Sequence, residues 1–196
     1  MSGWQGYAAE AETLLRQYEA LDFATVHAAV RHLLPAAPAR VLDVGAGTGR
    51  DAAALAAMGH AVVAVEPVEA LRHHAARLHP SPRIAWLEDS LPDLGRIEGR
   101  FGLVMLTAVW MHLDTTERQR GMKRLAALLE PGAPLLLSLR HGPVPPGRRM
   151  FAVAAEETIA LAEAAGLRMV LRIDRAPGAQ ARPDVRWTRL GFRAPA

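Results

Sequence analysis

The chain has 196 residues, of which 51% are hydrophobic and 22% charged, so it can bury the core of one α/β domain and is not a disordered protein. Its net charge is only +3, because 23 basic residues face 20 acidic ones, and this balance argues against a nucleic-acid partner. The chain has no cysteine, which excludes disulfides and thiolate metal sites. It also shows no signal sequence and no apolar run long enough to span a membrane, so we expect a cytoplasmic protein.

Apolar residues at helical spacing predict two helical segments near the N-terminus, at residues 8–20 and 23–34. Pro35 ends this region. We therefore predict an N-terminal helical cap over residues 1–37 and a main domain over residues 38–196.

In the main domain, short apolar runs alternate with helical patterns. The predicted strands are residues 40–44, 60–65, 83–87, 101–106, 134–139, 168–173 and 185–192, and the predicted helices are residues 49–58, 69–78, 114–129 and 156–165. Asp114 and Glu117 have the spacing of a capping box, and Gly166 stands where a helix usually stops. The last two strands have no helix between them, so they should pair as an antiparallel hairpin at one edge. The pattern predicts an α/β fold with a doubly wound, mostly parallel sheet of seven strands and an antiparallel C-terminal hairpin.

The most informative segment is residues 41–49, where a β-branched strand with an acidic residue leads into three glycines at alternate positions. A helical pattern follows at once. A strand, a glycine turn and a helix let a ligand lie against bare backbone at a helix N-terminus. A dinucleotide fingerprint, G-x-G-x-x-G, would need glycine at position 50, where Arg50 stands. The segment resembles instead the first motif of class I S-adenosylmethionine-dependent methyltransferases.

The resemblance implies a Rossmann-like fold, S-adenosylmethionine as the cofactor and a site beyond the carboxyl ends of the strands. It implies that Asp43 binds the amino group of methionine and that Glu66 accepts hydrogen bonds from both ribose hydroxyls. Asp89 would receive the adenine amine. The cofactor-binding residues that it implies are Asp43, Gly45, Ala46, Gly47, Thr48, Gly49, Arg50, Glu66, Pro67, Asp89, Ser90, Thr107 and Ala108. Plainer interpretations stay open: Asp43 can serve the glycine turn alone, and Arg50 can lie on the surface.

The segment after the fourth strand, residues 107–112, lacks the Asn/Asp-Pro-Pro-aromatic motif of enzymes that methylate adenine amines or the glutamine amide. This departure leaves acceptors that need only positioning or a general base. His112 and His141 are the two candidate bases, because an imidazole can take up a proton near neutral pH. Packing or capping explains either histidine as well. No zinc-protease, P-loop or serine-hydrolase motif is present, and we predict no metal site.

We therefore predict a methyltransferase that acts on a small-molecule acceptor by in-line methyl transfer. A short lid made of the N-terminal helices and the proline-rich loop at residues 142–151 suits a small acceptor. Two alternatives stay open: a nicotinamide-dependent oxidoreductase, and a module that binds S-adenosylmethionine without transferring its methyl group. The sequence does not determine the acceptor or the oligomeric state.

Overall fold

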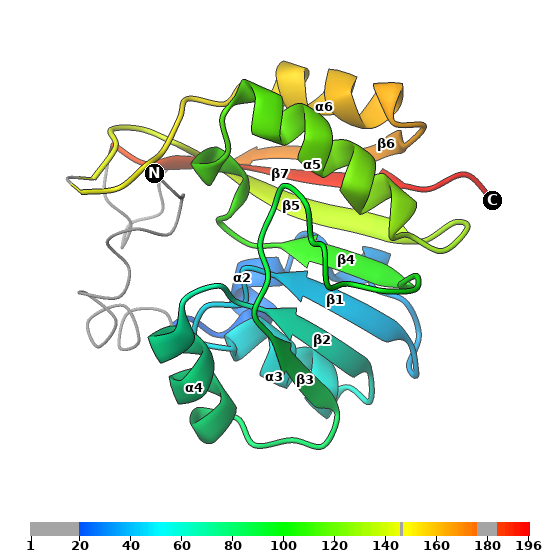
Figure 1. Ribbon diagram of the computed structural model, residues 1–196. Coiled ribbons are helices and arrows are strands. Elements are labelled where there is room, and N and C mark those ends of the chain that lie inside the picture. Colours follow the sequence, from blue (N-terminus) through cyan, green and yellow to red (C-terminus); the bar gives the residue numbers. More distant parts are fainter. Residues whose placement is uncertain (1–19, 146, 176–183) are drawn as a thin grey trace.

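Seven strands form one twisted sheet with helices on both faces (Figure 1). The computed structural model describes residues 20–145, 147–175 and 184–196, so the predicted helix at residues 8–20 lies almost wholly outside the described residues. The strands are β1 (Arg40–Val44), β2 (Ala61–Val65), β3 (Ile84–Leu87), β4 (Leu103–Leu106), β5 (Pro134–His141), β6 (Arg168–Arg175) and β7 (Arg186–Arg193). The helices are α2 (Phe23–His27), α3 (Arg50–Ala57), α4 (Glu69–Leu78), α5 (Thr115–Ala127) and α6 (Ala155–Ala164), with 3₁₀ turns η2 (Arg31–Leu33) and η3 (Trp110–His112).

The order of the strands across the sheet is β3-β2-β1-β4-β5-β7-β6. The pairs among β1 to β5 are parallel, whereas β7 runs antiparallel to both β5 and β6. The predicted fold class is therefore confirmed. Strand β7 is the inner member of the C-terminal hairpin and β6 forms the edge. All four residues of β4 are buried, as expected for a central parallel strand that is covered on both faces.

Two hydrophobic clusters fill the space between the sheet and its helices. On one face, Phe23, Val30 and Leu33 pack with residues of α3 and of the inner strands. On the other face, residues of α5 and α6 pack against β4, β5 and β7. Figure 1 shows α5 and α6 in front of the sheet and α3 behind it. The sheet is thus doubly wound, and its strand ends are held rigidly.

Most element boundaries differ from the prediction by one or two residues, and three differences are informative. The segment 23–34 is not one helix: the N–H of Val30 donates to the carbonyl of His27, and the tight turn that follows lets both halves reach the core. The 3₁₀ turn η3 was not predicted. Strand β5 continues to His141, beyond the predicted end at residue 139, because β7 pairs with it along its whole length.

Two local predictions at helix ends are confirmed. The N–H of Glu117 donates to the Asp114 carboxylate at 2.9 Å, and the N–H of Asp114 donates to Glu117 at 2.8 Å, which completes the capping box of α5. Gly166 follows α6 with φ of +86°, a backbone conformation that favours glycine. Within the described residues, no helix is long and apolar enough to cross a membrane.

Candidate functional site

The carboxyl ends of the parallel strands meet at one edge of the sheet, at the left in Figure 1. Strands β1 and β4 are neighbours there, although β1 leads to α3 on one face and the chain after β4 leads to α5 on the other. The order of strands reverses between them. Such a switch point opens a crevice beyond the strand ends, where ligands bind in open α/β sheets.

The glycine turn between β1 and α3 occupies this crevice. Gly45, Gly47 and Gly49 have φ of +70°, +57° and +90°, all in the left-handed region. A Cβ atom on Gly45 would lie 2.5 Å from a methyl carbon of Val109, so this position has no room for a side chain. At Gly47 the space is open, because the closest atom is the Gly45 carbonyl oxygen at 4.0 Å. The turn therefore presents bare backbone at Gly47.

Glu66, the residue after β2, joins the end of that strand to the glycine turn. Its Oε2 accepts a hydrogen bond from the N–H of Gly47 at 2.9 Å, and its Oε1 accepts one from the N–H of Val68 at 2.8 Å. Only 5% of the residue is exposed, and burial raises the pKa of its carboxyl, although the two N–H donors oppose this. The structure thus brings the predicted Glu66 together with the predicted glycine loop.

Asp43 lies in β1, beneath the same turn, and is 1% exposed. Its Oδ2 is buried and has no hydrogen-bond partner in the described part of the chain. Burial raises the pKa of this carboxyl well above its usual value, and the nearby negative charge of Asp51 adds to the effect. A buried carboxylate oxygen without a partner is costly, and a cationic group placed beside it would remove that cost.

Asp51, in the first turn of α3, is the centre of a buried network that the sequence did not predict. Nε2 of His27 lies 2.8 Å from Asp51 Oδ2, which also accepts from the Thr107 hydroxyl at 2.7 Å. Nε of Arg50 donates to Asp51 Oδ1 at 2.8 Å. Burial alone would raise the pKa of Asp51, but the hydrogen bond and charge of His27, together with Arg50, hold it far below its usual value. The network links α2 to the start of α3 and to the end of β4.

Arg50, one of the predicted cofactor-binding residues, is half-buried beside Asp51 and does not lie extended on the surface. His27 is not part of any motif that the sequence shows. A buried histidine on an apolar helix face could have been noticed, but its partner Asp51 is 24 residues away and only the fold brings the two together.

Most of the remaining predicted residues lie at the ends of β3 and β4. The carboxylate of Asp89 accepts from the N–H of Ser90 at 2.8 Å and from the N–H of Arg96 at 2.7 Å, so it also holds the loop that follows β3. Ala108 has φ of +60°, which is unusual for a residue with a side chain, and its N–H donates to the Ser138 hydroxyl at 2.9 Å. Ser138 on β5 therefore fixes the backbone that follows β4. Thr48 is buried and Pro67 is half-buried.

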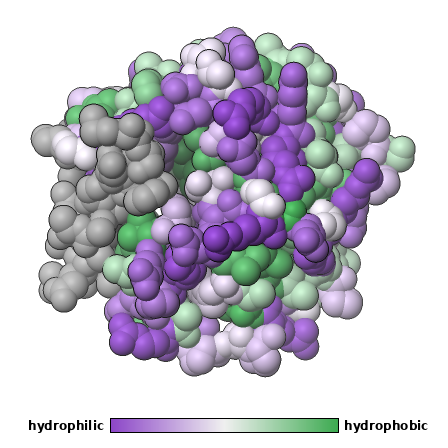
Figure 2. Space-filling view, viewed as in Figure 1, coloured by the Kyte–Doolittle hydropathy of each residue, from purple (hydrophilic) through white to green (hydrophobic). Residues whose placement is uncertain are grey.

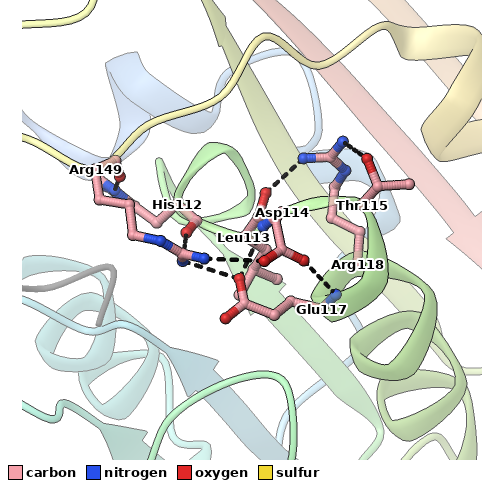
Figure 3. Close-up of polar contacts among 7 residues, drawn as sticks. All are labelled: His112, Leu113, Asp114, Thr115, Glu117, Arg118 and Arg149. Atoms are coloured by element: carbon pink, nitrogen blue, oxygen red, sulfur yellow. Dashed lines mark hydrogen bonds and ion pairs between the residues drawn. The ribbon is translucent and has the colours of Figure 1, made fainter. Parts of the chain in front are cut away.

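The two candidate bases occupy different positions. His112 ends η3, and its Nδ1 lies 2.9 Å from the carbonyl oxygen of Arg149, so this nitrogen must carry the proton (Figure 3). Burial lowers its pKa, and the charges of Arg148 and Arg149 lower it further. His141 is the last residue of β5, and its Nε2 lies 2.8 Å from the Thr188 hydroxyl. Burial, followed by the charge of Arg186, lowers the pKa of His141. The lowered pKa values favour the neutral form of both rings near pH 7.

Residues 41–132 of the chain match the family model of the methyltransferase domain. This range contains the glycine turn, Glu66 and the strands that form the switch point. The chain is also 32% identical over 126 residues to a demethylmenaquinone methyltransferase of Clavibacter sepedonicus, an alignment that covers 63% of this chain and 51% of that protein. The chain spans about half the length of the curated relatives that it matches.

Residues 41–132 are therefore similar to a methyltransferase domain.

Solved methyltransferases share the fold at low sequence identity. A structure described as a putative S-adenosylmethionine-dependent methyltransferase from Listeria monocytogenes superposes with a TM-score of 0.70 at 14% identity, covering 96% of this chain and 100% of the other. The 1,6-didemethyltoxoflavin-N1-methyltransferase of Burkholderia thailandensis, solved with 1,6-didemethyltoxoflavin and S-adenosylhomocysteine, has a TM-score of 0.67 at 21% identity, covering 98% and 80%.

The residues of the site fit S-adenosylmethionine, the cofactor predicted from the glycine turn. The cationic amino group of its methionine part complements the unpartnered Oδ2 of Asp43. The open backbone at Gly47 leaves room for a ligand where a side chain would stand. No cluster of three or more His, Asp or Glu residues able to hold a metal ion occurs in the ranges that the structure describes.

Proposed function

We propose that this protein transfers the methyl group of S-adenosylmethionine to a small-molecule acceptor. The observation that carries the proposal is the open Gly47 backbone between two buried carboxylates, Asp43 and Glu66, at the switch point of the sheet. When bound, S-adenosylmethionine supplies a sulfonium methyl group that is open to in-line attack. The protein's own task is alignment, which can contribute about 7–11 kcal/mol to lowering the barrier.

Each predicted residue then has a definite task toward the cofactor. Asp43 would receive the amino group, and Glu66 would accept the ribose hydroxyls with the lone pairs that the Gly47 and Val68 amides leave available. Asp89 would receive the adenine amine, beside the backbone of Ser90. The other residues that would line the cofactor are Gly45, Ala46, Thr48, Gly49, Arg50, Pro67, Thr107 and Ala108.

A small acceptor is supported by the pocket beside this edge. It has a volume of about 460 Å³ and lies between η3, the end of β5 and the start of α6. This volume is within the range of small-molecule sites. The Burkholderia neighbour was solved with a small heterocycle. The cytoplasmic location and the division into a cap of residues 1–37 and a domain of residues 38–196 remain predictions.

Calorimetry with S-adenosylhomocysteine and, in parallel, NAD⁺ tests the cofactor. We expect S-adenosylhomocysteine to bind and NAD⁺ not to bind. Binding of NAD⁺ alone would instead support the nicotinamide-dependent oxidoreductase. Transfer of a labelled methyl group to any member of an acceptor panel would then exclude a module that only binds the cofactor.

A further inference from the structure

The pocket beside the cofactor edge has a predominantly apolar lining. Its lining residues come from η3, β5, the loop after β5 and the start of α6: Met111, Arg140, His141, Gly142, Val144, Met150, Phe151, Ala152, Val153, Ala154 and Glu157. Val144 and Phe151 are 48% and 36% exposed, so they leave apolar surface open on the wall of the pocket. Figure 2 shows hydrophobic residues inside a hollow on a face that is otherwise largely hydrophilic. The pocket therefore suits a ligand with an apolar body.

One wall of the pocket is held in place by Arg149 (Figure 3). Its guanidinium donates to the His112 carbonyl at 2.7 Å and to the carboxylates of Glu117 and Asp114 at 2.9 and 3.1 Å. The N–H of Phe151 donates to the carbonyl of Met111 at 2.8 Å. These bonds attach the loop after β5 to η3 and to the start of α5, so the pocket is formed before any ligand arrives.

His141 brings a proton acceptor to this apolar pocket. Its Nε2 lies 2.8 Å from Oγ1 of Thr188, and the hydroxyl of Thr188 donates to Oδ1 of Asp174 at 2.7 Å. Since the single hydroxyl proton of Thr188 is directed at Asp174, Oγ1 must accept from His141, and Nε2 carries the ring proton. The lone pair of the neutral ring is therefore on Nδ1. None of the described residues hydrogen-bonds to Nδ1.

The sheet itself builds this chain of contacts. Asp174 on β6 pairs directly with Thr188 on β7, and Thr188 pairs with Leu139 on β5. His141 is two residues beyond Leu139, so it lies on the same face and diagonal to Thr188. Three neighbouring strands thus fix one imidazole tautomer.

The charges around His141 favour an acidic hydroxyl over an amine. Burial and the charges of Arg186 and Arg172 lower the pKa of His141, against the opposing charges of Asp174 and Glu156. Arg140 also lines the pocket, and its positive charge disfavours an ammonium group and stabilises an oxygen that becomes negative. Glu157, the acid that lines the pocket, accepts from Nε of Arg118 at 2.9 Å and is thereby neutralised.

We propose that this pocket is the acceptor subsite and takes a hydrophobic phenol-like compound, whose hydroxyl donates to Nδ1 of His141. This inference rests on the proposed methyltransferase function. As the bond between the acceptor oxygen and the methyl carbon forms, the sulfur–methyl bond breaks with its electron pair left on sulfur. The hydroxyl proton goes to Nδ1 and leaves later to water. Thr188 and Asp174 are positioning residues, because they keep the lone pair on Nδ1.

The test measures binding of 2-naphthol and of 2-methoxynaphthalene, which has the same apolar body but no hydroxyl proton. For the wild-type protein with S-adenosylhomocysteine, we expect 2-naphthol to bind roughly three- to tenfold tighter. His141→Phe should abolish this preference and leave the affinity for 2-methoxynaphthalene within about twofold. His73→Phe is the matched control, because His73 is an exposed histidine on α4, and it should keep the preference.

A second readout follows the tautomer. Nitrogen NMR of the unliganded protein should show His141 protonated at Nε2 and not at Nδ1. Thr188→Val should populate both tautomers of His141 and reduce the preference for 2-naphthol. Thr188→Ser keeps a hydroxyl, so it should keep both the Nε2-protonated tautomer and the preference. Wild-type protein that binds neither naphthalene compound at millimolar concentration, or binds both equally, overturns the proposal, as does an unchanged preference in His141→Phe. Failure of S-adenosylhomocysteine to bind would overturn the proposed function instead, and the NMR measurement separates the two.

Discussion

Replacement of Gly47 by alanine isolates the contact between the glycine turn and the cofactor. Gly47 has φ of +57°, and a Cβ atom there would meet no protein atom closer than 4.0 Å, so the folded protein can accept the methyl group. The cost to stability is the left-handed backbone, about 1–2 kcal/mol. For a chain of this size that corresponds to a decrease in the melting temperature of roughly 2–8 °C.

The same methyl group would lie where the cofactor approaches the backbone. Overpacking of this kind costs about 1–3 kcal/mol, which is roughly a 5- to 150-fold loss of S-adenosylhomocysteine affinity. Gly132→Ala is the matched control: Gly132 has φ of +72°, no atom lies within 4 Å of its Cβ position, and it lies in the turn before β5, far from the glycine turn along the chain. Both variants should lose similar stability, and only Gly47→Ala should lose affinity.

Calorimetric titration measures the S-adenosylhomocysteine affinity of the two variants, and thermal unfolding measures their stability. If Gly47→Ala unfolds a few degrees earlier and still binds S-adenosylhomocysteine like the wild type, the glycine turn is not the cofactor site. If Gly132→Ala loses the same affinity, the effect is a general one of stability and the reasoning from open space is wrong.

Three further predictions concern side chains of the site. Asp43→Asn should raise the free energy of unfolding of the unliganded protein by about 1–3 kcal/mol at pH 8 and weaken S-adenosylhomocysteine binding. Because the pKa of Asp43 is raised in the folded state, this carboxyl destabilises the wild type increasingly as the pH rises above the unfolded-state pKa of about 4. Equal stability of both proteins at pH 8 in denaturant titrations would contradict the assignment. Glu66→Gln leaves one oxygen to serve the Gly47 and Val68 amides and should lower S-adenosylhomocysteine affinity about tenfold or more, whereas the exposed Glu69→Gln should not, as calorimetry would show. Arg149→Ala should increase hydrogen exchange in the loop after β5 and weaken 2-naphthol binding with S-adenosylhomocysteine affinity unchanged; an equally protected loop would show that Arg149 does not hold that wall.

The local features of the site were predictable because each is formed by residues that lie close together in the sequence. The glycine turn needs only a strand, three glycines and a helix within residues 41–58, and its positive φ angles are ones that glycine adopts at little cost. The capping box of α5 is complete within four residues. Glu66 was found from its position at the end of a strand, and the structure brings it to the glycine turn as the parallel pairing of β1 and β2 requires.

The contacts that define the chemistry around these features were decided by tertiary structure alone. His27 and Asp51 are 24 residues apart, and His141 and Thr188 are 47 apart, so no sequence period links them. Strand β7 lies between β5 and β6 and pairs with β5 as far as His141, the last residue of β5, where Thr188 and Asp174 fix the tautomer of the ring. A local motif specifies its own backbone because the residues involved are neighbours in the chain. The position of a proton in the network of His141, Thr188 and Asp174 depends instead on side chains that only the complete sheet brings together.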